Sequence, residues 1–133
     1  MDSSIQTAPP SKAALWTGRI LSAIPVLILL MSGVMKFLKL PAVVQGFEHL
    51  GYPAKLALLL GILEVGCTII YLIPRTSILG AILLTGYLGG AIASHVRIGE
   101  YPNFVTIVIL GILVWLGLYL RDPRLRALIP LRT

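Results

Sequence analysis

The sequence has very little charge. Only 12% of its 133 residues are charged and 57% are hydrophobic, whereas a soluble domain carries about 25% charged residues. A water-soluble chain of this size needs far more polar surface. The deficit excludes a soluble globule and predicts an all-α integral membrane protein with a single domain.

Acidic residues are scarcer than basic ones. Five Asp and Glu residues stand against eleven Lys and Arg residues, which gives a formal net charge of +6. Such an excess can indicate nucleic-acid binding, but here the basic residues stand at the ends of apolar runs and form no basic face. We therefore expect no nucleic-acid partner. The basic residues are interpreted as membrane topology signals, with the lipid bilayer as the partner.

Cysteine and histidine are almost absent. Cys67 is the single cysteine, so these residues can form no intramolecular disulfide and no dithiol redox relay. Two histidines without cysteine partners are a weak metal signal, and we predict no metal site. The composition identifies no cofactor.

Long apolar runs fill most of the chain. A membrane-spanning helix needs about 20 apolar residues, and four stretches qualify, at 15–38, 54–73, 77–96 and 101–120. Tight turns marked by proline or glycine join the last three, which favours antiparallel neighbours. We predict an antiparallel, up-down-up-down bundle of four transmembrane helices over 15–120.

The remaining segments are polar or basic. We expect a flexible tail over 1–14, a basic tail over 121–133 and a short interfacial helix over Ala42–Leu50. Basic residues are more numerous on the side that holds both termini, so the positive-inside rule places both termini in the cytoplasm. That side holds Lys12, Arg19, Arg75, Arg121, Arg124, Arg126 and Arg132, and the other holds Lys36, Lys39, Lys55 and Arg97.

One acidic residue lies in the middle of a predicted span. Glu64 shares a helix face with Gly61 and Thr68. A charge at this depth costs at least about 2.5–3.5 kcal/mol on insertion scales, and an intramembrane ionisable group is a functional candidate. Glu64 is therefore predicted to be a proton carrier, an acid or base, or a ligand anchor. The structural alternative is a protonated carboxyl bonded to a neighbouring hydroxyl.

Polar side chains of the first and third predicted helices should converge on Glu64. Lys36 follows the polar, small-residue face of the first helix, although snorkelling to the headgroups is its alternative. His95 is equally consistent with a packing role. The candidate site residues are Glu64, Lys36 and His95 for catalysis and Tyr87, Ser94 and Arg97 for cofactor binding.

Gly86 and Gly90 form a small-xxx-small pair on the third predicted helix. Such pairs let helices approach closely. We favour packing inside the monomer, and the alternative is a homo-oligomer through these two glycines.

Five segments carry a resemblance to a known family. They are Ser32–Lys36 (SGVMK), His49–Pro53 (HLGYP), Gly61–Glu64 (GILE), Leu84–Arg97 (LTGYLGGAIASHVR) and Trp115–Asp122 (WLGLYLRD). Together they resemble the DoxX-like family of small bacterial integral membrane proteins. The resemblance implies four transmembrane helices in the bacterial inner membrane. It also implies a link to oxidoreductases, because the family is named after a subunit of a thiosulfate:quinone oxidoreductase.

Three functions follow as hypotheses. The first is a subunit or accessory of a membrane redox system, with an oxidoreductase partner and a pocket for a lipophilic ligand such as a quinone near Glu64. The second is a proton-coupled transporter of small molecules, because small four-helix exporters also use one membrane glutamate. The third is an intramembrane acid–base enzyme acting on a hydrophobic substrate. A fourth, purely structural helper role would use the glycine stripe.

Overall fold

The described part of the chain, residues 9–129 of the computed structural model, is helical and contains no strand. The all-α prediction is confirmed for these residues. The elements in chain order are α1 (Lys12–Phe37), α2 (Pro41–Leu50), α3 (Leu56–Leu72), the 3-10 turn η1 (Pro74–Thr76), α4 (Ser77–Arg97), α5 (Tyr101–Arg121) and α6 (Pro123–Leu128).

Three of these helical segments are long and apolar enough to cross a membrane: α1, Pro74–Arg97 and α5. The fourth predicted span, α3, is apolar as well but has only 17 residues. Its length is about 26 Å, slightly less than the roughly 30 Å of a bilayer's hydrocarbon core. A bundle of four transmembrane helices therefore stays a prediction, with three candidate spans established by length and composition.

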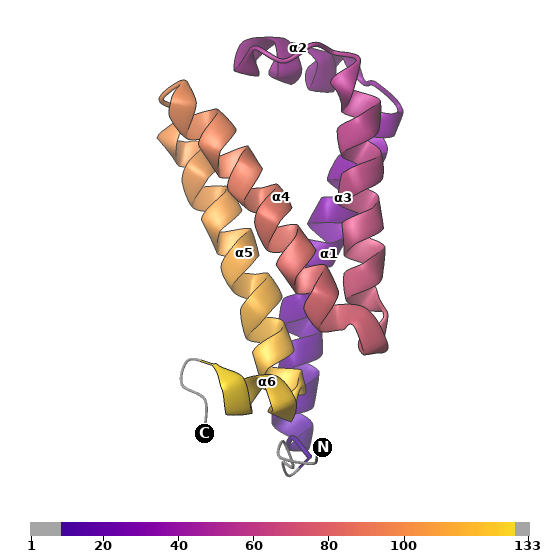
Figure 1. Ribbon diagram of the computed structural model, residues 1–133, viewed down its shortest axis with the longest axis vertical. Helices are drawn as coiled ribbons and strands as arrows, with labels where there is room; N and C mark the ends of the chain where they lie inside the picture. Colours follow the sequence, from indigo (N-terminus) through magenta and orange to yellow (C-terminus); the bar gives the residue numbers. More distant parts are fainter. Residues whose placement is uncertain (1–8, 130–133) are drawn as a thin grey trace.

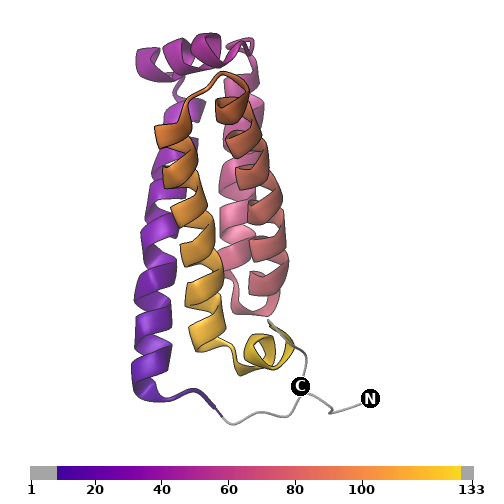
Figure 2. The ribbon, with the colours of Figure 1, turned by 90° about the vertical axis from the view of Figure 1, so that its left-hand side faces the viewer.

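Each long helix packs against two others. α1 contacts α3 and α5, and α4 contacts the same two helices. The start of α1 and the short helix α6 lie at one end of the molecule, and α2 lies across the other end (Figures 1 and 2). α3 and α4 meet at η1 and diverge toward the end that α2 covers (Figure 1).

Local sequence signals explain where the helices begin and end. Ser11 caps α1, because its hydroxyl oxygen accepts a hydrogen bond from the backbone N–H of Ala14 at 3.1 Å. Gly51 ends α2 in the left-handed conformation, with φ of 83°. Pro25 lies inside α1 without ending it.

The bounds extend the predicted ones in two places. α1 begins at Lys12, inside the segment predicted to be a flexible tail, and residues 1–8 of that tail lie outside the described residues. The predicted basic tail contains α6, which Asp122 caps; residues 130–133 lie outside the described part. The short helix expected over Ala42–Leu50 is present as α2.

Large apolar side chains cover the outside of the long helices. Leu27 is 65% exposed, Met31 63%, Leu59 58% and Ile112 57%. An apolar surface this extensive is unfavourable in water and matches the hydrocarbon of a bilayer. The fold therefore agrees with the low charge of the sequence.

α1 and α5 approach each other closely at the α6 end. A Cβ atom on Gly117 of α5 would lie 2.9 Å from the carbonyl oxygen of Gly18 in α1. Beside this contact the hydroxyl of Tyr71 donates to the Val114 carbonyl at 2.7 Å and lies 3.0 Å from the Ser22 hydroxyl. α1, α3 and α5 are thus joined at one buried point.

Gly86 and Gly90 pack against no part of the described chain. A Cβ atom on either residue would have no neighbour within 4 Å. The favoured prediction of close packing inside the monomer at these two glycines is therefore wrong. The reason is the divergence of α4 from α3, which leaves space at this level of α4. The alternative of a homo-oligomer stays a prediction.

The contact between Gly18 and Gly117 predicts a strong position effect. We expect Gly117→Ala to lower the free energy of unfolding by about 1–3 kcal/mol, because the added methyl group forces α1 away from α5. Gly66→Ala on α3 is the matched control, because a Cβ there meets nothing within 4 Å. It should leave stability unchanged or raise it by up to about 1 kcal/mol. Denaturant unfolding in detergent measures both, and equal effects would contradict the proposed contact.

Candidate functional site

Glu64 is the most deeply buried acidic or basic residue in the described chain. It stands at the middle of α3 and is 2% exposed. Three side chains donate hydrogen bonds to its Oε1 atom: Lys36 from Nζ at 2.7 Å, Tyr87 from its hydroxyl at 3.1 Å and Ser32 from its hydroxyl at 3.3 Å. The Lys36–Glu64 contact is an ion pair, which offsets the cost of burying either charge alone.

The close approach of α1 to α3 lets Lys36 reach Glu64. A Cβ atom on Gly61 would lie 3.0 Å from both the Gly33 carbonyl oxygen and the Lys36 Cβ atom. Lys36 also donates to Ser32, one turn earlier on α1, at 2.7 Å. With its side chain only 15% exposed, Lys36 turns into the protein and does not snorkel to the headgroups.

A cavity of about 610 Å³ opens beside this ion pair. α2 covers it from above, α3 and α4 form its sides, and the absent side chains of Gly86 and Gly90 leave it open. Its apolar wall comes mainly from Val43, Phe47, Leu50, Leu56, Leu60 and Leu63. Its polar lining residues are Lys36, Tyr52, Tyr87, Ser94 and His95. Glu64 is not a lining residue, so it lies behind Lys36 and Tyr87.

A second polar cluster ties α2 to the turn between α4 and α5. Glu100 contacts His49 Nε2 through Oε2 at 2.7 Å and His95 Nδ1 through Oε1 at 3.1 Å. Hydrogen bonds from His95 and then His49 lower the pKa of the Glu100 carboxyl below its usual value. The cluster lies at the edge of the cavity, because His95 also lines it.

Further contacts hold the α2 end of the molecule. The Tyr52 hydroxyl lies 2.6 Å from the Ser94 hydroxyl, and Ser94 itself donates to the Gly90 carbonyl at 2.9 Å. Arg97 donates to the Leu50 carbonyl, and its guanidinium lies 5.9 Å from the centre of the Tyr52 ring. The cover formed by α2 is therefore fastened to α4 by side chains from both segments.

The structure brings together part of the predicted site. Glu64, Lys36 and Tyr87 form one hydrogen-bonded group. Ser94 and His95 line the same cavity but bond to Tyr52 and Glu100. Arg97 is exposed and lies outside the cavity lining, on the Leu50 carbonyl.

Sequence reasoning missed several members of this region. Ser32 had a usable signal, since it stands four residues before Lys36 on the same helix face. Tyr52 and the His49–Glu100 pair had no such signal, because residues whose contact partners lie 42 or 51 positions away in the sequence leave no periodic pattern. Within residues 9–129, no group of three or more His, Cys, Asp or Glu side chains is placed to hold a metal ion.

The apolar outer surface, the membrane-length helices and the buried ion pair define an integral membrane protein. The family model described as the DoxX-like family matches residues 20–117, well over half of the sequence. The chain belongs to the DoxX-like family, as its motifs indicated. No curated protein and no solved structure gives a significant match.

The Lys36–Glu64 ion pair should be strongly coupled. We expect Lys36→Met and Glu64→Gln each to lower the free energy of unfolding by about 3–5 kcal/mol, because each leaves a buried charge without its partner. The double variant should lose less than the sum of the two, with a coupling of about 0.5–3 kcal/mol. Unfolding in detergent measures the full cycle. Additive losses would show that the two charges do not stabilise each other.

The Glu100 cluster should make the position of α2 depend on pH. The folded-state pKa of Glu100 is lowered. The contribution of Glu100 to holding α2 in place is therefore complete above the ordinary glutamate pKa, and it is lost as the pH falls through the lowered pKa. Pulsed EPR between spin labels at Gln45 and Thr106, in a Cys67→Ala background, should give a narrow distance distribution at pH 7 that broadens in acid.

In Glu100→Gln the same distribution should be broad at every pH. Glu48→Gln is the matched control, since Glu48 is an exposed acid on α2 itself. A distribution in Glu100→Gln that still narrows at pH 7 would show that Glu100 does not hold α2.

Proposed function

We propose that this protein binds a lipophilic molecule with acceptor oxygens, such as a quinone, in the cavity beneath α2, as a subunit or accessory of a membrane redox system. The observation that carries the proposal is the state of the Lys36 ammonium group. It has three N–H donors, and within the described chain Ser32 and Glu64 take two of them. The third is available at the cavity wall, which Lys36 lines.

The cavity has the character of a small-molecule site. Ligand pockets commonly measure about 300–1,000 Å³ and combine apolar walls with a few placed polar groups, and this cavity measures about 610 Å³. A ring with carbonyl oxygens would place one oxygen near Lys36 and its ring against Leu60, Leu63 and Phe47. An apolar tail would leave toward the surrounding lipid.

Glu64 is assigned a supporting role in this scheme. It holds the Lys36 ammonium and the Tyr87 hydroxyl in place by accepting a hydrogen bond from each. It also forms a continuous hydrogen-bonded path between these two groups, along which a proton can move when the charge on a bound ligand changes. His95 and Ser94, which line the cavity from α4, are the candidates for contact with the other end of a polar ring.

The setting of this proposal is the bacterial inner membrane, with four spans and both termini in the cytoplasm. Membership of the DoxX-like family and the larger number of basic residues at the α6 end support it. The electrons would come from an oxidoreductase partner, because one cysteine provides no dithiol couple.

A proton-coupled transporter is the second candidate. The observation that favours it is the same ion pair, since protonation of Glu64 would release Lys36 and change the cavity. The acid–base enzyme has less support, because Glu64 is not among the residues that line the cavity. Proton release on ligand binding that disappears in Glu64→Gln would favour the transporter, and binding without proton release would favour the redox accessory.

Filling the cavity from α4 should weaken binding. We expect Gly90→Leu to weaken the binding of a short-tailed benzoquinone by about tenfold or more, because the new side chain occupies the cavity and each 1.4 kcal/mol is tenfold in affinity. Microscale thermophoresis or quenching of intrinsic tryptophan fluorescence, with protein in detergent, measures the affinity.

The adjacent residue provides the control. Gly89→Leu adds the same side chain one position earlier, on a different face of α4 that does not line this cavity. It should bind the quinone within about twofold of the wild type. Equal loss in both variants, or no loss in Gly90→Leu, would remove the cavity from the proposal.

A further inference from the structure

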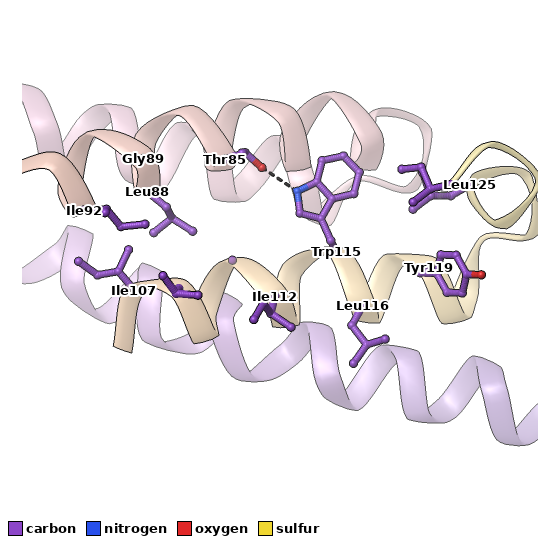
Figure 3. Close-up of a pocket in the computed structure, with 13 residues that line it drawn as sticks. Thr85, Leu88, Gly89, Ile92, Ile107, Ile112, Trp115, Leu116, Tyr119 and Leu125 are labelled. Atoms are coloured by element: carbon purple, nitrogen blue, oxygen red, sulfur yellow. Dashed lines mark hydrogen bonds between the residues drawn. The ribbon is translucent and has the colours of Figure 1, made fainter. Parts of the chain in front are cut away.

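A second hollow lies on another face of α4. It is a groove of about 770 Å³ between α4 and α5, and its lining includes Ile129. Leu125 of α6 lies at one end of it (Figure 3). Gly89 and Gly111 keep it open, because a Cβ on Gly89 would meet nothing within 4 Å and one on Gly111 only the Leu88 side chain at 3.9 Å. None of its lining residues also lines the cavity beside Lys36.

The polar groups inside this groove are already bonded to each other. The indole N–H of Trp115 donates to the Thr85 hydroxyl oxygen at 2.7 Å (Figure 3), and the Thr85 hydroxyl donates to the Ala81 carbonyl at 2.7 Å. The remaining side chains along the groove are chiefly Ile, Leu and Val. Tyr119, near Leu125 at the α6 end, is the other lining residue with a polar side-chain group (Figure 3). The rest of the groove surface is apolar and suits a hydrocarbon chain.

The α6 end of the groove carries positive charge. Arg121, Arg124 and Arg126 stand against a single carboxylate, Asp122, in the segment 121–128. Asp122 is engaged in capping α6, since its Oδ1 accepts from the backbone N–H of Arg124 at 2.9 Å. Arg121 is held inside by the Ser22 hydroxyl, to which its Nε donates at 3.0 Å.

The other two arginines are not committed to a carboxylate in the described chain. Arg124 is exposed. Arg126 has a buried Nε with no hydrogen-bond partner, and its Nη2 reaches the Leu120 carbonyl only at 3.5 Å. Both flank Leu125, which lines the groove. Two guanidinium groups therefore stand beside the end of an apolar channel, an arrangement that complements a phosphate with an attached acyl chain.

The length of the groove matches one leaflet. From Ile107 to Tyr119, the lining residues of α5 span twelve positions, which is about 18 Å along a helix. Half of a bilayer's hydrocarbon core is about 15 Å. An acyl chain whose headgroup lies at α6 would reach the far end of the groove near the bilayer centre.

We propose that the α4–α5 groove is a binding site for one anionic phospholipid, with an acyl chain against Gly89 and Gly111 and the phosphate at Arg124 and Arg126. This inference is independent of the ligand proposed for the cavity beneath α2. The bound lipid comes from the leaflet on the α6 side.

Native mass spectrometry of the full chain, delipidated in detergent, tests the site with phosphatidylglycerol and phosphatidylcholine of identical acyl chains. We expect one phosphatidylglycerol per chain, bound about fivefold or more tightly than phosphatidylcholine. A single basic residue near the membrane surface already strengthens the binding of an anionic lipid by about fivefold. In Arg124→Gln/Arg126→Gln this preference should disappear while weak binding of both lipids remains.

The groove itself is tested by filling it. Gly89→Leu should lose the bound phosphatidylglycerol, and Gly90→Leu, which faces the other cavity, should retain it. If Gly89→Leu does not fold, a photoactivatable phosphatidylglycerol added to the wild type answers the same question, and its label should map to α4 and α5 between Gly89 and Ile112. Equal affinity for the two lipids, retention in Gly89→Leu, label elsewhere, or a chain dimer that Gly89→Leu abolishes would each overturn the proposal.

Discussion

The Lys36–Glu64 ion pair is the constraint on which the surrounding structure depends. A carboxylate at the centre of an apolar helix is costly unless a partner and further hydrogen bonds compensate it. Here the compensation comes from two other helices, because Lys36 and Ser32 belong to α1 and Tyr87 to α4. Glu64 therefore fixes the relative positions of three helices at a level where α4 already diverges from α3.

The glycines of α1 and α3 make this compensation possible. Gly33 and Gly61 allow the two backbones to approach, and the short distance brings the base of Lys36 beside α3. The lysine stem then covers apolar surface while its ammonium group reaches the carboxylate. The result is a pair of donors, Lys36 and Tyr87, held at the wall of a cavity by an acid that lies behind them.

Much of this could be predicted from the sequence, and the reasons for success and failure are physical. Long apolar runs in the sequence predict the helices. Glu64, Lys36 and Tyr87 could be placed together because each lies on a polar or small-residue face with helical spacing. The cavity could not be predicted, since it arises from the divergence of α4 and α3. The pair Gly86 and Gly90 was misinterpreted, because small residues permit a close contact and an empty space equally well. His95 was placed with Glu64 because its turn of α4 faces inward, but Glu100 follows within five residues and competes for it.

Gly89 and Gly90 are neighbours on one helix, yet one borders the α4–α5 groove and the other the cavity beneath α2. α4 is thus a partition one helix thick between a compartment open to lipid and a compartment beside a charged pair. The two spaces share no lining residue, so an occupant of one removes no contact from the other. Two consecutive residues without side chains thus let a single helix border a lipid-facing groove and a cavity beside a charged pair at the same level.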